Sequence, residues 1–183
     1  PECFLDQLEA NTPLRADIRR AIEAGLPAYA ECGGLMYLAR SIEWQGRSAA
    51  MVGVIPGDIR MHPKPVGRGY VILEANADHP WRNAATCDIA DQEAGPASAQ
   101  APLYAHEFHY SSLSGLPTDT RYAYTVRRGH GIDGRHDGVL LHRLLASYTH
   151  LRATNGCDWP ANFVRHVRAC LTANQKEALP CSP

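Results

Sequence analysis

The pattern of apolar and polar residues predicts helices at both ends of the chain and mostly strands between them. Apolar residues recur at helical spacing over residues 1–8, 14–24 and 160–174. Asn11, followed by Thr and Pro, is a typical start for the second of these helices, and Gly25 is a typical end. A chain that alternates helices with strands is expected to adopt an α/β fold.

Short runs rich in β-branched and aromatic residues predict the strands. They cover residues 51–55, 69–73, 103–110, 122–128 and 139–148. Gln45-Gly46 and Pro56-Gly57 are turn dipeptides. Residues 91–100, rich in Ala, Gly, Ser and Pro, are expected to form a surface loop, and residues 176–183 to fray.

A further helix is predicted directly after a short strand, in residues 27–37 (Pro-Ala-Tyr-Ala-Glu-Cys-Gly-Gly-Leu-Met-Tyr). The apolar run before Cys32 predicts the strand, and helical spacing begins at Gly34. Cys32 therefore lies at a strand-to-helix turn, the geometry that exposes a nucleophile. Ala30 and Gly34, two positions to either side, are small enough for strand and helix to pack closely.

The same position has two readings. A helix N-terminus favours a thiolate, which is the reactive form of cysteine. A free cysteine between a strand and a helix is, however, most often an inert buried residue. Spacing alone does not decide between a nucleophile and a core residue at Cys32.

Composition narrows the class of protein. The chain has 183 residues, of which 45% are hydrophobic, enough for one sizeable core, and its net charge of -1 gives no basis for binding nucleic acid or an acidic membrane. No signal peptide or long apolar run is present, and the six cysteines form no C-x-x-C pair. We therefore expect a cytoplasmic protein with reduced thiols, a disulfide-bonded secreted domain being the alternative.

Three segments resemble one known family. They are residues 30–38 (Ala-Glu-Cys-Gly-Gly-Leu-Met-Tyr-Leu), 106–111 (His-Glu-Phe-His-Tyr-Ser) and 147–150 (Ser-Tyr-Thr-His). Together they are similar to the C-terminal glutamine amidotransferase domain of the cobyrinate a,c-diamide synthase family, a class I or triad amidotransferase. The resemblance implies a flavodoxin-like α/β domain whose central, mostly parallel sheet is flanked by helices.

The resemblance also implies an active site. Cys32 corresponds to the nucleophile that attacks glutamine, and His150 to the histidine that moves the proton. The N–H of Gly33 would bind the oxyanion, as expected for the residue that follows a nucleophile. Because Cys32 and His150 are far apart in the sequence, only the fold can bring them together.

The third member of the triad does not follow from the sequence. Many triad amidotransferases have a Glu two residues after the histidine, but Arg152 occupies this position, and a guanidinium cannot accept the imidazole N–H. Glu31 and Glu107 are candidates for the acceptor.

The segment 106–111 does not predict a metal site. His106-Glu107-Phe108-His109 is one residue short of the zinc motif H-E-x-x-H, and strand periodicity places the two histidines on opposite faces. No metal is expected, and no role for His106, Glu107 or His109 follows from the sequence.

Nucleotide binding is not predicted for this chain. Residues 129–134 match G-x-G-x-x-G, but a strand follows them instead of a helix, so we expect a hairpin loop, and no P-loop motif occurs. The resemblance implies that ATP and Mg²⁺ bind a separate N-terminal P-loop domain, which activates carboxylates of a corrin-type tetrapyrrole. Residues 1–183, which begin without Met, are then one amidotransferase domain truncated at its N-terminus.

Three alternatives remain open at this point. The acceptor could be another tetrapyrrole, such as hydrogenobyrinic acid or nickel sirohydrochlorin. The domain could be catalytically silent and serve as a binding module. It could also be a cysteine hydrolase of the same fold that acts on peptides or small amides. The oligomeric state, and whether the chain is active alone, do not follow from the sequence.

Overall fold

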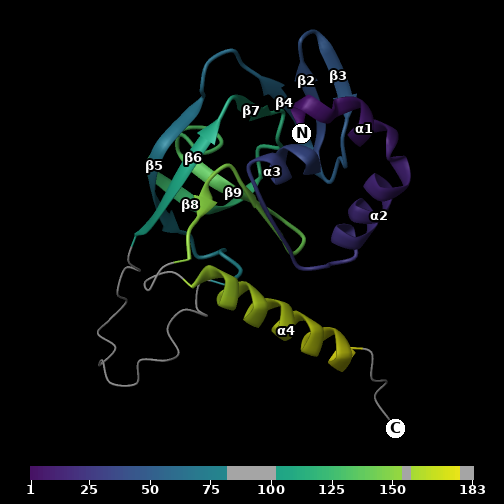
Figure 1. Ribbon diagram of the computed structural model, residues 1–183. Helices are drawn as coiled ribbons and strands as arrows, with labels where there is room; N and C mark the ends of the chain where they lie inside the picture. Colours follow the sequence, from purple (N-terminus) through teal and green to yellow (C-terminus); the bar gives the residue numbers. More distant parts are fainter. Residues whose placement is uncertain (82–101, 154–157, 178–183) are drawn as a thin grey trace.

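Helices lie near both ends of the chain and mostly strands between them, as the sequence predicts (Figure 1). The computed structural model describes residues 1–81, 102–153 and 158–177, and the side chains of residues 174–177 are not described. The expected loop at 91–100 and most of the expected tail at 176–183 lie outside these residues.

The predicted helices are confirmed near both ends of the chain. The side chain of Asn11 accepts a hydrogen bond from the Leu14 N–H at 3.3 Å, and Gly25 ends the second helix with a φ of 87°. Asp158 accepts one from the Ala161 N–H at the start of the last helix. A 3-10 turn at Glu2–Phe4 leads into the first helix, and the helices are α1 (Leu5–Ala10), α2 (Thr12–Glu23), α3 (Gly33–Leu38) and α4 (Trp159–Glu177).

The larger sheet has seven strands in the order β1-β10-β9-β8-β5-β6-β11. Its strands are β1 (Ala28–Glu31), β5 (Gly67–Ala75), β6 (Leu103–His109), β8 (Arg121–Arg128), β9 (His136–Leu141), β10 (Leu144–Ser147) and β11 (His150–Leu151). The α/β class is confirmed, but the sheet is mixed and not mostly parallel. Among the described strands of this sheet only β1 and β10 pair in parallel.

Short connections explain the antiparallel pairs. A parallel pair needs a crossover of a dozen or more residues, whereas β8, β9 and β10 follow one another through tight turns. The predicted single strand at 139–148 is in fact two strands, because the chain reverses at His142, which has a φ of 52°. Residues 129–134 form the expected loop between β8 and β9.

A second sheet, in the order β3-β2-β4-β7, was not predicted. The Gln45-Gly46 turn joins two of its strands as expected, but Pro56-Gly57 lies inside a strand and residues 51–54 outside one. Only glycine fits at position 57, because a Cβ there would lie 2.9 Å from the Ser114 carbonyl oxygen of the neighbouring strand. The strands are β2 (Ala39–Trp44), β3 (Arg47–Ala50), β4 (Ile55–Met61) and β7 (Ser111–Ser114).

Two apolar clusters stabilise the fold. The first joins α1, α2 and α3 to the smaller sheet and to β10, with Leu35, Ile42, Ile55 and Ile59 fully buried. The second lies beneath the larger sheet, where Phe163 of α4 packs against Trp81 with ring centroids 5.3 Å apart. In Figure 1, α4 therefore lies away from α1 and α2.

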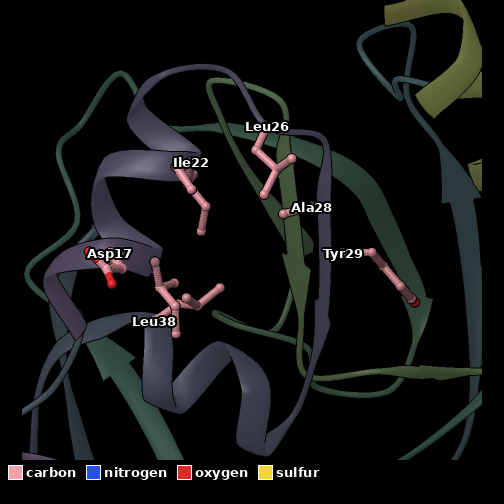
Figure 2. A pocket seen from close by; sticks show the side chains of 8 residues that line it. Asp17, Ile22, Leu26, Ala28, Tyr29 and Leu38 are labelled. Carbon is pink, nitrogen blue, oxygen red and sulfur yellow. The ribbon is translucent and has the colours of Figure 1, made fainter. Parts of the chain in front are cut away.

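Strand β1 is at the edge of the larger sheet, and an apolar groove lies beside it (Figure 2). The groove has a volume of 440 Å³ and is lined by Ile18, Ala21 and Ile22 of α2, together with Leu26, Ala28 and Leu38. Leu26 is largely exposed. The edge of the sheet at the start of β1 is thus apolar and open beside α2 in the described structure.

Candidate active site

Cys32 occupies the sharp turn between β1 and α3 that the sequence predicts. Its φ of 46° and ψ of -103° are rare for a residue with a side chain. A Cβ on Gly34 would lie 3.2 Å from the Cβ of Ala30, so the two small residues do allow the close approach of strand and helix. The cysteine side chain is half-buried at the end of β1.

The fold brings the histidine segment to the same end of the sheet. Strand β1 pairs in parallel with β10, with Glu31 opposite Ser147. The Cys32 N–H donates to the Ser147 carbonyl at 2.7 Å, three residues before His150. Cys32 therefore stands at the carboxyl end of β1, and His150 follows three residues after the end of its parallel neighbour β10. Ligands of open α/β sheets bind at this edge.

Glu31 links the two segments. One of its oxygens lies 3.4 Å from His150 Nδ1, and the other accepts hydrogen bonds from the Leu151 N–H at 2.8 Å and from the Tyr29 hydroxyl at 2.6 Å. Burial, with Tyr124 and Glu31 nearby, raises the pKa of Tyr29, so its hydroxyl stays a donor to Glu31. Of the two candidates for the acceptor of the histidine N–H, Glu31 is the one beside His150.

Asp137 also holds this segment, and no pattern in the sequence points to it. Its fully buried carboxylate accepts hydrogen bonds from the backbone N–H groups of Tyr148 and Thr149, both at 3.0 Å, and from the Thr149 hydroxyl. Burial raises the pKa of Asp137, against these hydrogen bonds. An Asp-Gly pair in a sequence indicates a turn, and only the fold shows what its side chain binds.

The electrostatic surroundings of Cys32 differ from the expectation of a stabilised thiolate. Burial raises the pKa of the Cys32 thiol, and the carboxylates of Glu2 and Glu31 act in the same direction, while the Gly33 N–H opposes them. The six-residue α3 does not overcome these effects. The thiol of Cys32 is therefore stabilised relative to its thiolate.

The segment 106–111 divides between surface and core, as its strand periodicity predicts. His106 is exposed, whereas Glu107 and His109 are almost fully buried. His106 lies opposite His150 in the β6·β11 pairing, and the His109 ring stacks on Tyr148 with centroids 3.9 Å apart. Glu107 therefore lies near His109 and not beside His150.

The described residues show neither a metal-binding cluster nor a membrane-spanning helix. Among the described residues, no group of three or more His, Cys, Asp or Glu side chains is placed to bind a metal ion. No helix in the described part of the chain is long and apolar enough to cross a membrane.

A comparison with known families agrees with this geometry. Residues 1–157 match the CobB/CobQ-like glutamine amidotransferase domain. The chain belongs to this family. The match includes Cys32, Gly33 and His150, although it does not by itself assign their roles.

Relatives within the family are named cobyrinate a,c-diamide synthase. One from Magnetococcus marinus is 39% identical over 92% of this chain and 33% of its own length. One from Archaeoglobus fulgidus is 35% identical over 90% of this chain and 32% of its own length. The chain thus spans about a third of the relatives it matches.

Solved structures share the amidotransferase fold. A glutamine amidotransferase crystal structure superposes with a TM-score of 0.57 at 14% identity, over 88% of this chain and 72% of that one. The structure of PurLQS from Thermotoga maritima gives 0.56 at 15% identity, over 86% of this chain and 68% of that one. At such identities the likeness concerns the fold alone.

Proposed function

We propose that this chain is a glutaminase domain that releases ammonia from glutamine. The observation that supports it most is the junction of β1 and β10, where the Cys32 N–H bonds to Ser147 and Glu31 contacts His150. It supports the proposal because the segments that contain Cys32 and His150, which both match the family's motifs, meet there. A catalytically silent domain has no need for the rare backbone angles of Cys32, which cost about 1–3 kcal/mol.

The reaction follows from these groups. His150 removes the proton from the Cys32 thiol, and the sulfur attacks the side-chain amide carbon of glutamine. His150 then gives the proton to the leaving ammonia as the C–N bond breaks, which leaves a glutamyl thioester. A water molecule, deprotonated by His150, hydrolyses the thioester to glutamate and restores the thiol. The Gly33 N–H stabilises the oxyanion in both halves of the reaction.

Glu31 completes the triad in this proposal. Its carboxylate accepts the Nδ1–H of His150, which leaves Nε2 free to receive the thiol proton and stabilises the imidazolium that forms. Arg152 is exposed and is not needed for this role. The orienting acid thus precedes the nucleophile in the sequence instead of following the histidine.

The acceptor of the ammonia is assigned from the relatives. Their name supports amidation of cobyrinic acid, a corrin-type tetrapyrrole, in cobalamin biosynthesis. We propose that this reaction takes place in the cytoplasm. We propose that ATP and Mg²⁺ act in a separate P-loop domain, because the relatives are about three times as long as the matched chain. The apolar groove beside β1 is also suited to burial in a longer protein.

The test is glutamine hydrolysis by the longer protein, measured as ammonia and glutamate release. We expect Cys32→Ser and His150→Ala to lose almost all activity. Glu31→Gln is expected to lower kcat at least tenfold with a smaller change in KM, because in this proposal Glu31 contacts His150 and not glutamine. Glu74→Gln, which removes a carboxylate from an exposed ion pair with Arg127, is the control. Near wild-type activity in Cys32→Ser or His150→Ala would refute the corresponding role.

A further inference from the structure

The buried pair Glu107 and His109 has no part in the reaction described above, yet it contacts the segment that contains His150. The side chains of both residues are at most 2% exposed, and His109 Nε2 lies 3.6 Å from a Glu107 oxygen. A Cβ on Gly67 would lie 2.2 Å from His109 Nε2 and 2.8 Å from the Glu107 carboxylate. The pair is therefore enclosed so tightly that only a glycine fits above it.

The His109 ring has one hydrogen bond and one charged neighbour. Nδ1 lies 2.8 Å from the Ser111 carbonyl oxygen, which only accepts, so Nδ1 bears a proton. Nε2 lies beside the Glu107 carboxylate, at 3.6 Å, and has no hydrogen-bond partner among the described residues. The hydrogen bond at Nδ1 and the carboxylate beside Nε2 together fix the orientation of the ring.

Glu107 is in turn held as an anion. Its two oxygens accept the backbone N–H groups of His130 at 2.7 Å and Gly131 at 2.9 Å. Burial by itself raises the pKa of Glu107, but the His109 ring and these two N–H groups outweigh it, so the pKa lies below its usual value. The carboxylate thus anchors the loop between β8 and β9 to β6.

His109 reaches Tyr148 by two routes. The rings are stacked, with centroids 3.9 Å apart and planes 9° from parallel. Ser111, whose carbonyl accepts from His109, also donates its hydroxyl proton to the Tyr148 oxygen at 3.0 Å. Tyr148 is fully buried and lies two residues before His150, between His109 and the backbone contacts to Asp137.

We propose that Glu107 and His109 are positioning residues, which hold Tyr148 and thereby set the place of His150 at the Cys32 end of β1. The proposal rests on the proposed glutaminase function and assigns a role to the His-Glu-Phe-His-Tyr-Ser segment. Neither residue touches the reacting atoms. They act as a charged support behind the Ser-Tyr-Thr-His segment.

The chain contains a matched control for this arrangement. His136 stacks on Tyr122 with centroids 4.9 Å apart and pairs with Asp133 at 2.9 Å, but its side chain is 41% exposed. His109→Phe and His136→Phe therefore each keep an aromatic ring beside a tyrosine and remove the contact to a carboxylate. Glu107→Gln is the third variant, in which an amide NH₂ would face a backbone N–H.

The first measurement is turnover per correctly folded molecule, in the longer protein. We expect His109→Phe and Glu107→Gln to lower kcat by about 10- to 100-fold, as small displacements of a catalytic group do. KM is expected to change much less, and active molecules are counted by Cys32 labelling with a glutamine-analogue electrophile. His136→Phe is expected to keep wild-type kcat. A wild-type kcat in folded His109→Phe would overturn the proposal.

The second measurement does not depend on activity. In ¹⁵N-histidine NMR spectra, we expect Nδ1 of His109 to bear a proton. We also expect the ring signals of His150 to shift in Glu107→Gln and His109→Phe but not in His136→Phe. Unshifted His150 signals would overturn the positioning role, even if turnover fell. If the wild-type protein releases no ammonia but the His150 signals still shift in Glu107→Gln and His109→Phe, the glutaminase function is refuted and the positioning of His150 by the pair is retained.

Discussion

At the scale of single residues, the site depends on an unusual cysteine. Cys32 has a positive φ that is rare for a residue with a side chain, and its backbone N–H is held by Ser147. Burial raises the pKa of its thiol, so the resting enzyme is not a ready thiolate. In the proposed reaction, His150 must therefore remove the thiol proton when glutamine binds.

The raised pKa of Cys32 gives a testable pH dependence. Because only the thiolate reacts, the rate of Cys32 alkylation by iodoacetamide is expected to rise with pH and to level off above the ordinary thiol value of about 8.5. Glu2→Gln is expected to lower this midpoint, since the Glu2 carboxylate raises the pKa. The measurement is mass spectrometry of the Cys32 peptide, which separates it from exposed Cys3. A midpoint at or below the ordinary thiol value would contradict the raised pKa of Cys32.

At the scale of elements, the contact between β1 and α3 decides the geometry of the turn. The sequence predicts this strand, turn and helix because a buried run, two small residues and a helical period follow one another. It does not predict the break within residues 139–148, because no Gly or Pro interrupts the apolar run and His142 makes the turn instead. The sequence thus predicts a turn where small residues are needed for close packing. It does not predict a turn where a residue other than glycine adopts a positive φ, as His142 does.

A substitution at Gly34 tests this contact. Gly34→Ala would normally stabilise a helix by up to about 1 kcal/mol. Here the new Cβ lies 3.2 Å from the Cβ of Ala30, so strand and helix must separate. We expect a net loss of about 1 kcal/mol in the free energy of unfolding, together with lower kcat.

The compensating variant is Ala30→Gly combined with Gly34→Ala, which returns the lost space. Urea denaturation and glutamine turnover are the measurements. We expect the double variant to recover part of both stability and kcat relative to Gly34→Ala. Equal defects in the single and double variants would show that the Ala30 contact does not limit the turn.

At the scale of the whole molecule, the site joins segments that the sequence presents separately. Cys32 and His150 are recognisable from their motifs, and Glu31 is one of two candidates that only the fold distinguishes. Asp137 leaves no signal, because its function depends on backbone N–H groups of a later segment. The roles of Glu107 and His109 require the stacking on Tyr148, which joins β6 to the end of β10.

The single parallel pairing of the larger sheet also has a consequence for the order of folding. Strands β8, β9 and β10 are neighbours in the chain and can associate early, whereas β1 reaches β10 only by closing a long loop, with Glu31 and Leu151 120 residues apart. After dilution from denaturant, far-UV circular dichroism should therefore recover before Cys32 regains reactivity toward diazo-oxo-norleucine. Recovery of both signals at one rate would contradict this. In a cell, the last step of folding would then also be the step that switches on chemistry, so incompletely folded chains would consume no glutamine.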